Sequence, residues 1–155
     1  MSVAPAGDPT FDDYAVGDRF ECGSVTISEA EIVEFASRYD RQAKHVDRAA
    51  AAASPFGSLI ASGWQTAALS MQLLIDRGVL TGEHALGVGI DELRWLAPVR
   101  GGDTLSLAVE VVDRALSRPD ARRGTIRAAM EMRNQTGTLV FSQTAILSLR
   151  RRPAG

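Results

Sequence analysis

Residues 62–77 restrict the possible folds more than any other segment, because apolar side chains recur there at helical spacing on several sides. Six of these side chains form one stripe: Trp64, Ala67, Ala68, Met71, Leu74 and Ile75. Leu69 and Leu73 lie outside the stripe, so the predicted helix is apolar on most sides, and a helix of this kind is buried on most sides. Gly78 follows as the expected C-terminal cap. The segment therefore predicts a central helix that other elements surround.

Strands are predicted for most of the chain after this helix. They cover residues 85–96, 103–116, 125–134 and 138–150, and apolar and polar side chains alternate clearly in the second and third. A strand near residues 19–25 comes before the helix, and a capping box of Ser28 and Glu31 begins a further helix that runs to about Tyr39. These elements predict an α+β fold, in which an antiparallel meander curls around one long helix.

Length and composition indicate one ordinary globular domain. The 155 residues suffice for a single domain over residues 11–152, with residues 1–10 as a flexible arm. The formal net charge of −2 argues against nucleic-acid binding, since no basic excess is present to neutralise phosphates. A single cysteine, Cys22, excludes an internal disulfide and a cysteine-rich metal site, and the sequence shows no other metal-ligand cluster. Neither a signal peptide nor an apolar stretch long enough for a bilayer is present, so a cytoplasmic protein without membrane contact is expected.

Asp40 and His45 are the candidates for proton transfer. On one helix, five steps of about 100° would leave them roughly 140° apart, so they can meet only if the chain leaves the helix between them. The sequence favours such a break, because helical periodicity ends near Tyr39 and the apolar pattern does not resume before Ala49. A carboxylate beside an imidazole can hold one water molecule and exchange protons with it. Taken singly, Asp40 also fits an acid at a helix end, and His45 also fits a surface histidine.

The same segment resembles the MaoC-like dehydratases, the (R)-specific enoyl-CoA hydratases of the hotdog fold. Their signature is Asp-x-Asn-Pro-x-His-x-Asp, followed by a Phe-containing turn and an Ala-His-Gly or similar triplet. The residues that match it in order and spacing are Asp40, His45, Asp47, Phe56, Gly57 and Ala61-Ser62-Gly63. The sequence departs from the family pattern at Gln42, Ala43, Lys44 and Ser62, and Met71 stands where some members have a serine. Residues 98–105 also resemble a turn that is common across hotdog proteins.

The resemblance implies a single hotdog, with the sheet wrapped around the long helix, and an enzyme that adds water reversibly to a 2-enoyl-CoA. Asp40 and His45 would be the catalytic pair. Gly63 would offer a backbone N–H at the helix N-terminus to the thioester oxygen, although a glycine there also suits close packing alone. The residues expected to contact the substrate are Ser62, Trp64, Met71, Arg94 and Arg100. Coenzyme A would enter as part of the substrate, with its phosphates near the two arginines, and no metal ion or redox cofactor is expected.

Two other functions stay open. Many hotdog acyl-CoA thioesterases carry a carboxylate on the central helix, whereas residues 63–71 contain none. A non-catalytic acyl-thioester-binding or assembly subunit is consistent with the departures at Gln42, Ala43 and Lys44, which alter the loop that positions His45. Asp47 is interpreted as a helix cap, and His84 as a solvated turn residue.

A homodimer or larger assembly is expected, with its sites at the subunit boundary. One sheet of about five strands leaves an exposed edge, and exposed edges favour pairing. A short sheet also cannot cover residues 63–75 on all sides. A second copy related by a two-fold axis is therefore expected to extend the sheet and close over both helices.

Overall fold

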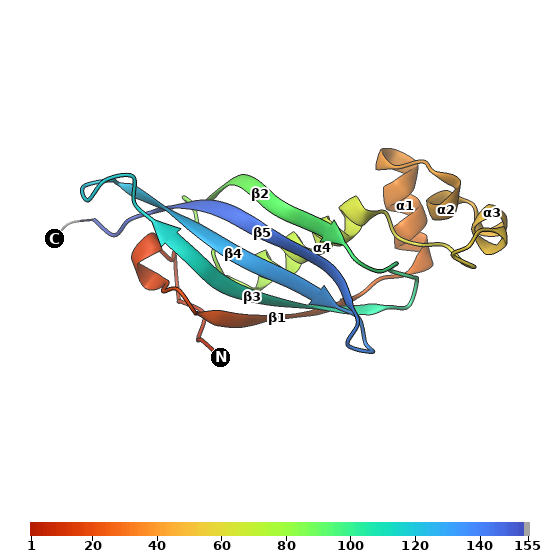
Figure 1. Cartoon of the computed structure of the whole chain (residues 1–155), viewed down its shortest axis with the longest axis horizontal. Coiled ribbons are helices and arrows are strands. Elements are labelled where there is room, and N and C mark those ends of the chain that lie inside the picture. Colours follow the sequence, from red (N-terminus) through yellow and green to blue (C-terminus); the bar gives the residue numbers. More distant parts are fainter. Residues whose placement is uncertain (154–155) are drawn as a thin grey trace.

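The computed structural model describes residues 1–153, in which five antiparallel strands form one sheet (Figure 1). The strands are β1 (Arg19–Thr26), β2 (Leu86–Trp95), β3 (Thr104–Ala115), β4 (Arg123–Arg133) and β5 (Leu139–Arg150). From one edge to the other their order is β1-β3-β4-β5-β2. Each strand begins and ends within two residues of its predicted position, because the alternation of apolar and polar side chains follows the pleat of the backbone.

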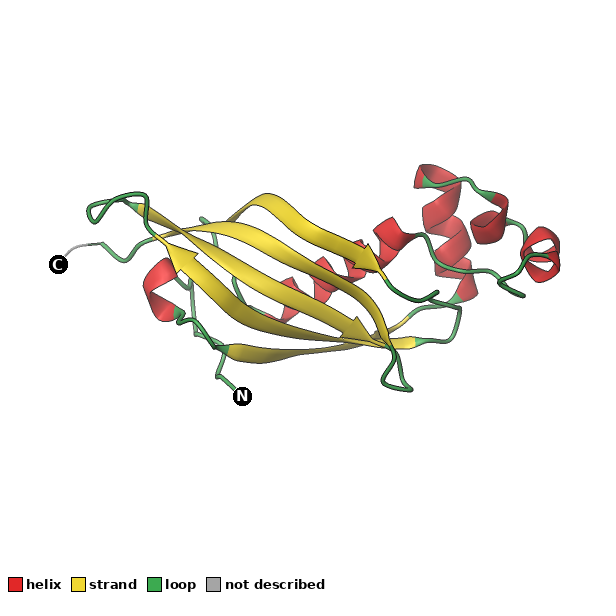
Figure 2. Cartoon of the chain, viewed as in Figure 1, coloured by secondary structure: helices red, strands yellow, loops and turns green. Residues whose placement is uncertain are grey.

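Helices cover one face and one end of this sheet. The helical elements are η1 (Phe11–Asp13), α1 (Glu29–Tyr39), α2 (Ala43–Val46), α3 (Arg48–Ala53) and α4 (Gly63–Arg77). The long helix α4 runs along the sheet, whereas α1, α2 and α3 gather beyond the end at which α4 begins (Figure 2). This is the predicted α+β arrangement, with the sheet wrapped around a long helix. The single 3-10 turn η1 was not predicted, since three residues are too few to show a period.

The prediction of a continuous meander after α4 is wrong for one strand. The strands β3, β4 and β5 do form a meander, and residues 134–137 make the expected hairpin turn. However, β2 pairs with β5 at one edge of the sheet, and β1 pairs with β3 at the other. Side-chain alternation identifies strands but says nothing about which strands are neighbours, and this explains the error.

The core lies between the sheet and one face of α4. The inward residues of β4 are fully or almost fully buried, namely Ile126, Ala128, Met130 and Met132. Helix α4 contributes Leu73 and Leu74 to the same core, whereas Trp64, Met71 and Ile75 are 58%, 38% and 54% exposed. The prediction that α4 is buried on most sides is therefore wrong within one chain. The sheet wraps only one side of the helix and leaves an apolar stripe uncovered.

The N-terminal arm contacts the edge strand β1. Ser2 donates its backbone N–H to the carbonyl oxygen of Arg19 at 2.7 Å, so the N-terminal arm touches the start of β1. The flexibility of that arm and the proposed domain bounds stay predictions. Within residues 1–153, no helix combines the length and apolar character that crossing a membrane requires.

Candidate active site

The break that the sequence predicted after Tyr39 brings the two candidate residues together. Asp40 is the C-cap of α1, and its backbone angles of φ −155° and ψ 67° turn the chain out of the helix. The chain then forms the short helix α2, which was not predicted because it spans only four residues. The N–H of His45 donates to the carbonyl oxygen of Gln42 at 2.9 Å, and this first turn of α2 presents the imidazole to Asp40.

The imidazole and the carboxylate lie in contact. Nε2 of His45 is 3.4 Å from Oδ2 of Asp40, and the two side chains are only 4% and 17% exposed. On the other side of the ring, Nδ1 is 2.7 Å from the carbonyl oxygen of Ile60. A carbonyl oxygen only accepts hydrogen bonds, so Nδ1 carries a hydrogen and Nε2 is the nitrogen that faces Asp40. The ring is therefore held in one orientation, with its reactive nitrogen toward the cleft.

Two further donors hold the Asp40 carboxylate. Ser62 donates its hydroxyl to Oδ2 at 2.7 Å, and Gln42 donates its side-chain amide to Oδ1 at 2.7 Å. The hydrogen bond from Ser62, followed by the one from Gln42, lowers the pKa of the Asp40 carboxyl, and the nearby His45 acts in the same direction. Asp40 is therefore ionised at neutral pH. These two contacts to Asp40 were not predicted, because Gln42 and Ser62 stand at positions where the family pattern has other residues.

The hydrogen bond from Ser62 leads to a prediction about pH dependence. A reaction that needs the Asp40 carboxylate is lost as the pH falls through the pKa of that group. Replacing Ser62 with alanine removes the strongest donor and raises the Asp40 pKa, so the acid limb of the rate profile is expected to move to higher pH. The control is Ser70→Ala on the same helix, because Ser70 donates only to the carbonyl oxygen of Ala67. An unchanged acid limb in Ser62→Ala would contradict this role.

Gly63 begins α4 directly after Ser62, as predicted. As the first residue of the helix, it has a backbone N–H without an intrahelical partner, at the end where the helix dipole is positive. The glycine is also packed closely, since a Cβ atom at this position would lie 2.4 Å from the nearest indole atom of Trp95. The Trp95 ring in turn packs edge-on against Trp64, with the ring centroids 5.1 Å apart. Two tryptophans thus flank the helix N-terminus.

Gly63 can serve either as a backbone donor to the thioester oxygen or only as a residue that permits close packing. Its contact with Trp95 allows these two roles to be tested separately. Gly63→Ala is expected to lower turnover, because the added methyl group crowds both the indole and any ligand at the helix N-terminus. In the double variant Gly63→Ala/Trp95→Ala the indole is absent. If the double variant turns over substrate much more slowly than Trp95→Ala alone, a ligand needs the space next to Gly63. Equal turnover in those two variants would leave Gly63 with a packing role only.

One cleft of about 460 Å³ is lined by Asp40, His45, Gly63 and the two tryptophans. Ser62, which was expected to contact the substrate, is fully buried and does not line this cleft, so that role stays a prediction. Its polar wall consists of Asp40, Gln42, Lys44, His45 and Thr66. Its apolar wall includes Phe56, Ile60, Ala61, Trp64, Trp95, Leu96, Ala97, Pro98, Val99 and Val140. A cleft with one polar and one apolar wall suits a ligand that has a reactive polar end and an aliphatic part.

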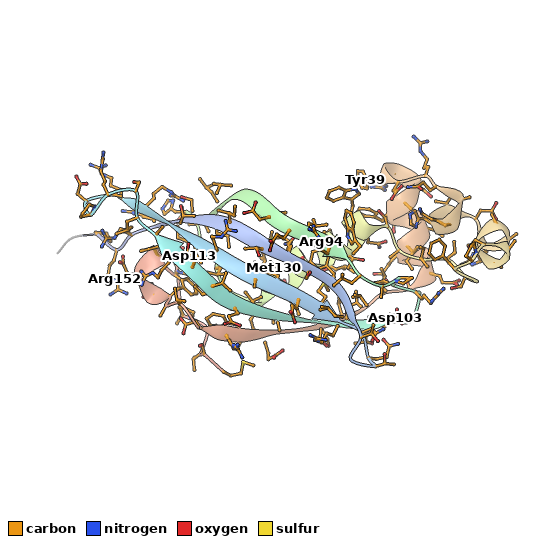
Figure 3. All side chains as sticks on the ribbon, viewed as in Figure 1. Tyr39, Arg94, Asp103, Asp113, Met130 and Arg152 are labelled. Atoms are coloured by element: carbon orange, nitrogen blue, oxygen red, sulfur yellow. The ribbon has the colours of Figure 1, made fainter. Side chains whose placement is uncertain are left out.

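The other predicted site residues lie elsewhere, and their roles stay predictions. Met71 is two turns further along α4 and does not line the cleft. Arg94, which Figure 3 labels, lies near the end of β2, is exposed and donates to the carbonyl oxygen of Leu93. Arg100 donates to the carbonyl oxygen of Phe56 at 2.6 Å and to the hydroxyl of Ser58, and so fixes the turn that lines one side of the cleft.

Two plainer expectations are met at residues outside the cleft. The Asp47 side chain accepts a hydrogen bond from the N–H of Ala50 at 3.0 Å and caps α3, as predicted. His84 is exposed, which agrees with a solvated turn residue. Cys22 is buried, and burial raises the pKa of its thiol to about 11, so it is not a reactive nucleophile at neutral pH.

The fold and the site together define a class of protein: a hotdog sheet around one helix, with a carboxylate and an imidazole beside the helix N-terminus. The family model of the MaoC-like domain matches residues 14–132, which is more than half of the chain. The chain therefore belongs to the MaoC-like dehydratase family.

Individual relatives agree with this assignment. The 3-hydroxybutyryl-CoA dehydratase of Methylorubrum extorquens is 37% identical over 113 residues, which cover 72% of this chain and 69% of the relative. The solved MaoC-like dehydratase of Rhodospirillum rubrum has a TM-score of 0.87 at 37% identity, and covers 94% of this chain and 99% of its own. The (R)-hydratase PhaJ1 of Pseudomonas aeruginosa has a TM-score of 0.76 at 28% identity, with 94% and 88% covered. These relatives are hydratases or dehydratases, so the family-level class is that of hydro-lyases.

A solved assembly is also similar. The ChsH1-ChsH2 complex of Mycobacterium tuberculosis has a TM-score of 0.70 at 25% identity, and the match covers 88% of this chain and 98% of the matched one. Oligomers therefore occur among the relatives of this chain.

Proposed function

We propose that the protein catalyses the reversible addition of water to a 2-enoyl-CoA or a related enoyl thioester, which gives the (R)-3-hydroxyacyl thioester. The observation that carries this proposal is the contact of 3.4 Å between the buried His45 imidazole and the Asp40 carboxylate, beside the N-terminus of α4. Hydration requires a base for water, an acid for C2 and donors for the enolate oxygen. Asp40, His45 and Gly63 offer these functions in one cleft. The activities in the names of the relatives support the same class of reaction.

In the proposed reaction, the thioester oxygen accepts a hydrogen bond from the N–H of Gly63. One water molecule within reach of Oδ2 of Asp40 and Nε2 of His45 loses a proton to the pair as its oxygen bonds to C3. The electrons of the C2–C3 double bond move toward the thioester oxygen, where the N–H and the helix dipole stabilise the enolate. The pair then returns a proton to C2 as the thioester carbonyl re-forms. In total H and OH add from the same side, dehydration is the reverse, and no step needs a metal ion or a redox cofactor.

The loop that departs from the family signature still positions the pair, and this favours an enzyme over a non-catalytic subunit. Gln42 holds Oδ1 of Asp40, and the carbonyl oxygen of Lys44 accepts the N–H of Ile60 at 3.1 Å. The second bond ties α2 to the segment whose carbonyl orients His45. The side chain of Gln42 and the backbone of Lys44 therefore both contribute to the geometry of the site.

Incubation with crotonyl-CoA separates the three functions. Loss of the enoyl absorbance is the result expected for a hydratase. Release of free thiol without hydration would instead support a thioesterase, and binding without turnover would support an acyl-thioester-binding subunit. Either of the latter outcomes, obtained also with longer enoyl thioesters, would contradict the proposed reaction.

We also propose that the working form is at least a homodimer in which β2 pairs with its copy. The exposed stripe of α4, formed by Trp64, Ala68, Met71 and Ile75, lies on the uncovered side of the helix. The edge strand β2 exposes further apolar side chains, namely Leu86, Val88, Ile90 and Trp95. Such a broad apolar surface on a sheet edge is typical of an interface. Trp64 and Trp95 belong both to this surface and to the cleft, so a second copy would complete the cleft.

A further inference from the structure

Lys44 is a cation without a partner in the candidate active site. It is the only lysine in the sequence, and it lines the cleft next to His45. Of the 17 lysine and arginine side chains, all within residues 1–153, four form neither a hydrogen bond nor an ion pair with the described chain: Arg41, Lys44, Arg122 and Arg150. The three arginines are exposed, whereas Lys44 is half-buried.

The neighbouring carboxylates do not serve as the counter-ion of Lys44. Both oxygens of Asp40 already accept hydrogen bonds, from Ser62 and from Gln42. Ser62 and Gln42 are the main causes of the lowered pKa of Asp40. The Lys44 charge lowers this pKa by a smaller amount, as expected for a cation that is near Asp40 without contacting it. The next carboxylate along the chain, Asp47, is used as the cap of α3.

Because no carboxylate of the described chain is bonded to the Lys44 ammonium, an anionic ligand in the cleft can contact it without breaking an existing ion pair. Arg94 and Arg100 were expected to contact the phosphates of coenzyme A, but neither is available for an anionic ligand in this cleft. Arg100 is occupied by the turn that contains Phe56 and Ser58, and Arg94 lies outside the cleft lining. Lys44 is therefore the cation that is free to receive an anionic ligand in this cleft.

We propose that Lys44 contacts an anionic group of the thioester substrate and thereby contributes to substrate selection. This inference rests on the function proposed above. An ammonium forms charge-assisted hydrogen bonds with phosphate and carboxylate oxygens alike. The anion is either a phosphate of the thioester carrier or a carboxylate on the acyl group, and the two sources differ in how the substrate must be changed to remove the charge.

Chemical labelling tests the contact without turnover. Because Lys44 is the only lysine, an acetylating reagent modifies only Lys44 and the N-terminal amine of Met1, which belongs to an exposed residue. Saturating butyryl-CoA, a thioester without a double bond to hydrate, is expected to slow the acetylation of Lys44 at least about fivefold if the charged contact forms. The acetylation rate of Met1 serves as the internal reference and should not change. Equal rates at Lys44 with butyryl-CoA, with butyryl-pantetheine and with a thioester that carries an acyl carboxylate would overturn the proposal.

Kinetics of Lys44→Met identify the source of the anion. Loss of the charged contact is expected to raise KM about tenfold and to leave kcat within about twofold, and Lys44→Arg should restore most of the affinity. If the partner is a carrier phosphate, the increase appears with crotonyl-CoA and is absent with crotonyl-pantetheine, which has no phosphate. If the partner is an acyl carboxylate, the increase appears only with an enoyl thioester that has a terminal carboxylate. Arg41→Met is the matched control, since Arg41 is an unpaired cation of the same loop that does not line the cleft.

The two hypotheses fail in different ways. An unchanged KM in Lys44→Met for all three substrates, in a parent protein that hydrates them, would overturn the Lys44 contact alone. Protection of Lys44 in a parent protein that hydrates none of them would overturn the proposed reaction and would support the contact. A shift of the pH profile without a change in KM would mean that Lys44 acts only through Asp40, and this too would overturn the contact.

Discussion

Asp40→Asn and replacement of His45 are each expected to lower hydratase turnover by at least about a hundredfold, the low end for loss of an acid–base group. Asparagine at position 40 still accepts the hydrogen bond of Ser62 but has no carboxylate that can take a proton. The buried position of His45 changes the choice of variant, because His45→Ala would leave the carbonyl oxygen of Ile60 without its donor. Such a loss costs about 1–3 kcal/mol of stability. His45→Asn is the better variant, since its amide can still donate toward Ile60.

Matched controls separate catalysis from folding in this experiment. Asp47→Asn changes the neighbouring aspartate, and asparagine is a good N-cap, so it should keep both the fold and the rate. His84→Ala removes the only other histidine, which is exposed. Initial rates with the preferred enoyl thioester and melting temperatures are measured for the four variants and the parent protein. Near-parental rates in both Asp40→Asn and His45→Asn would show that the pair does not carry out the reaction.

The sequence predicted the strands and the sheet wrapped around one helix, but not the order of the strands in the sheet. Alternation in β4 identified both the strand and its inward side chains, from Ile126 to Met132, because the pleat places every second residue on the core face. The neighbour of β2 was not predictable in this way, since alternation within a strand carries no information about its pairing with β5. The apolar residues of α4 correctly predicted that one face of the helix is buried in the core. The sequence also indicated that one short sheet cannot cover this helix on all sides, and the exposed Trp64, Met71 and Ile75 agree with this.

The candidate site was also predicted only in part. The pair of Asp40 and His45 was predicted because residue type, spacing and a helix break all lie in one short segment. The contact of Trp95 with Gly63 was not predicted, because it joins residues of two distant elements and depends on how the end of β2 crosses α4. In the sequence, Gln42 is only a departure from the family signature, and Ser62 is a departure that was expected to contact the substrate. In the folded chain, both hold the carboxylate of Asp40.

A charge on the apolar edge is expected to separate the proposed dimer and abolish its activity in dilute solution. Val88→Lys would place an ammonium where β2 is proposed to meet its copy, and Met71→Glu would place a carboxylate on the exposed stripe of α4. An uncompensated charge in a buried interface costs about 3–5 kcal/mol, which weakens dimerisation on the order of a hundredfold or more. Both variants should stay folded as single chains, since both side chains are exposed in the chain alone.

Sedimentation combined with activity measurements at micromolar concentration decides this prediction. The parent protein should sediment with at least twice the 16.6 kDa of one chain, whereas Val88→Lys and Met71→Glu should sediment as single chains of low activity. Val16→Lys is the control, because Val16 is an exposed valine that lies outside both β2 and α4. The cleft borders the proposed interface through Trp64 and Trp95, so loss of the dimer should lower kcat/KM as well as the mass. A fully active parent protein with the mass of one chain would rule out both the dimer and the shared site, because the apolar edge would then be exposed in the working enzyme.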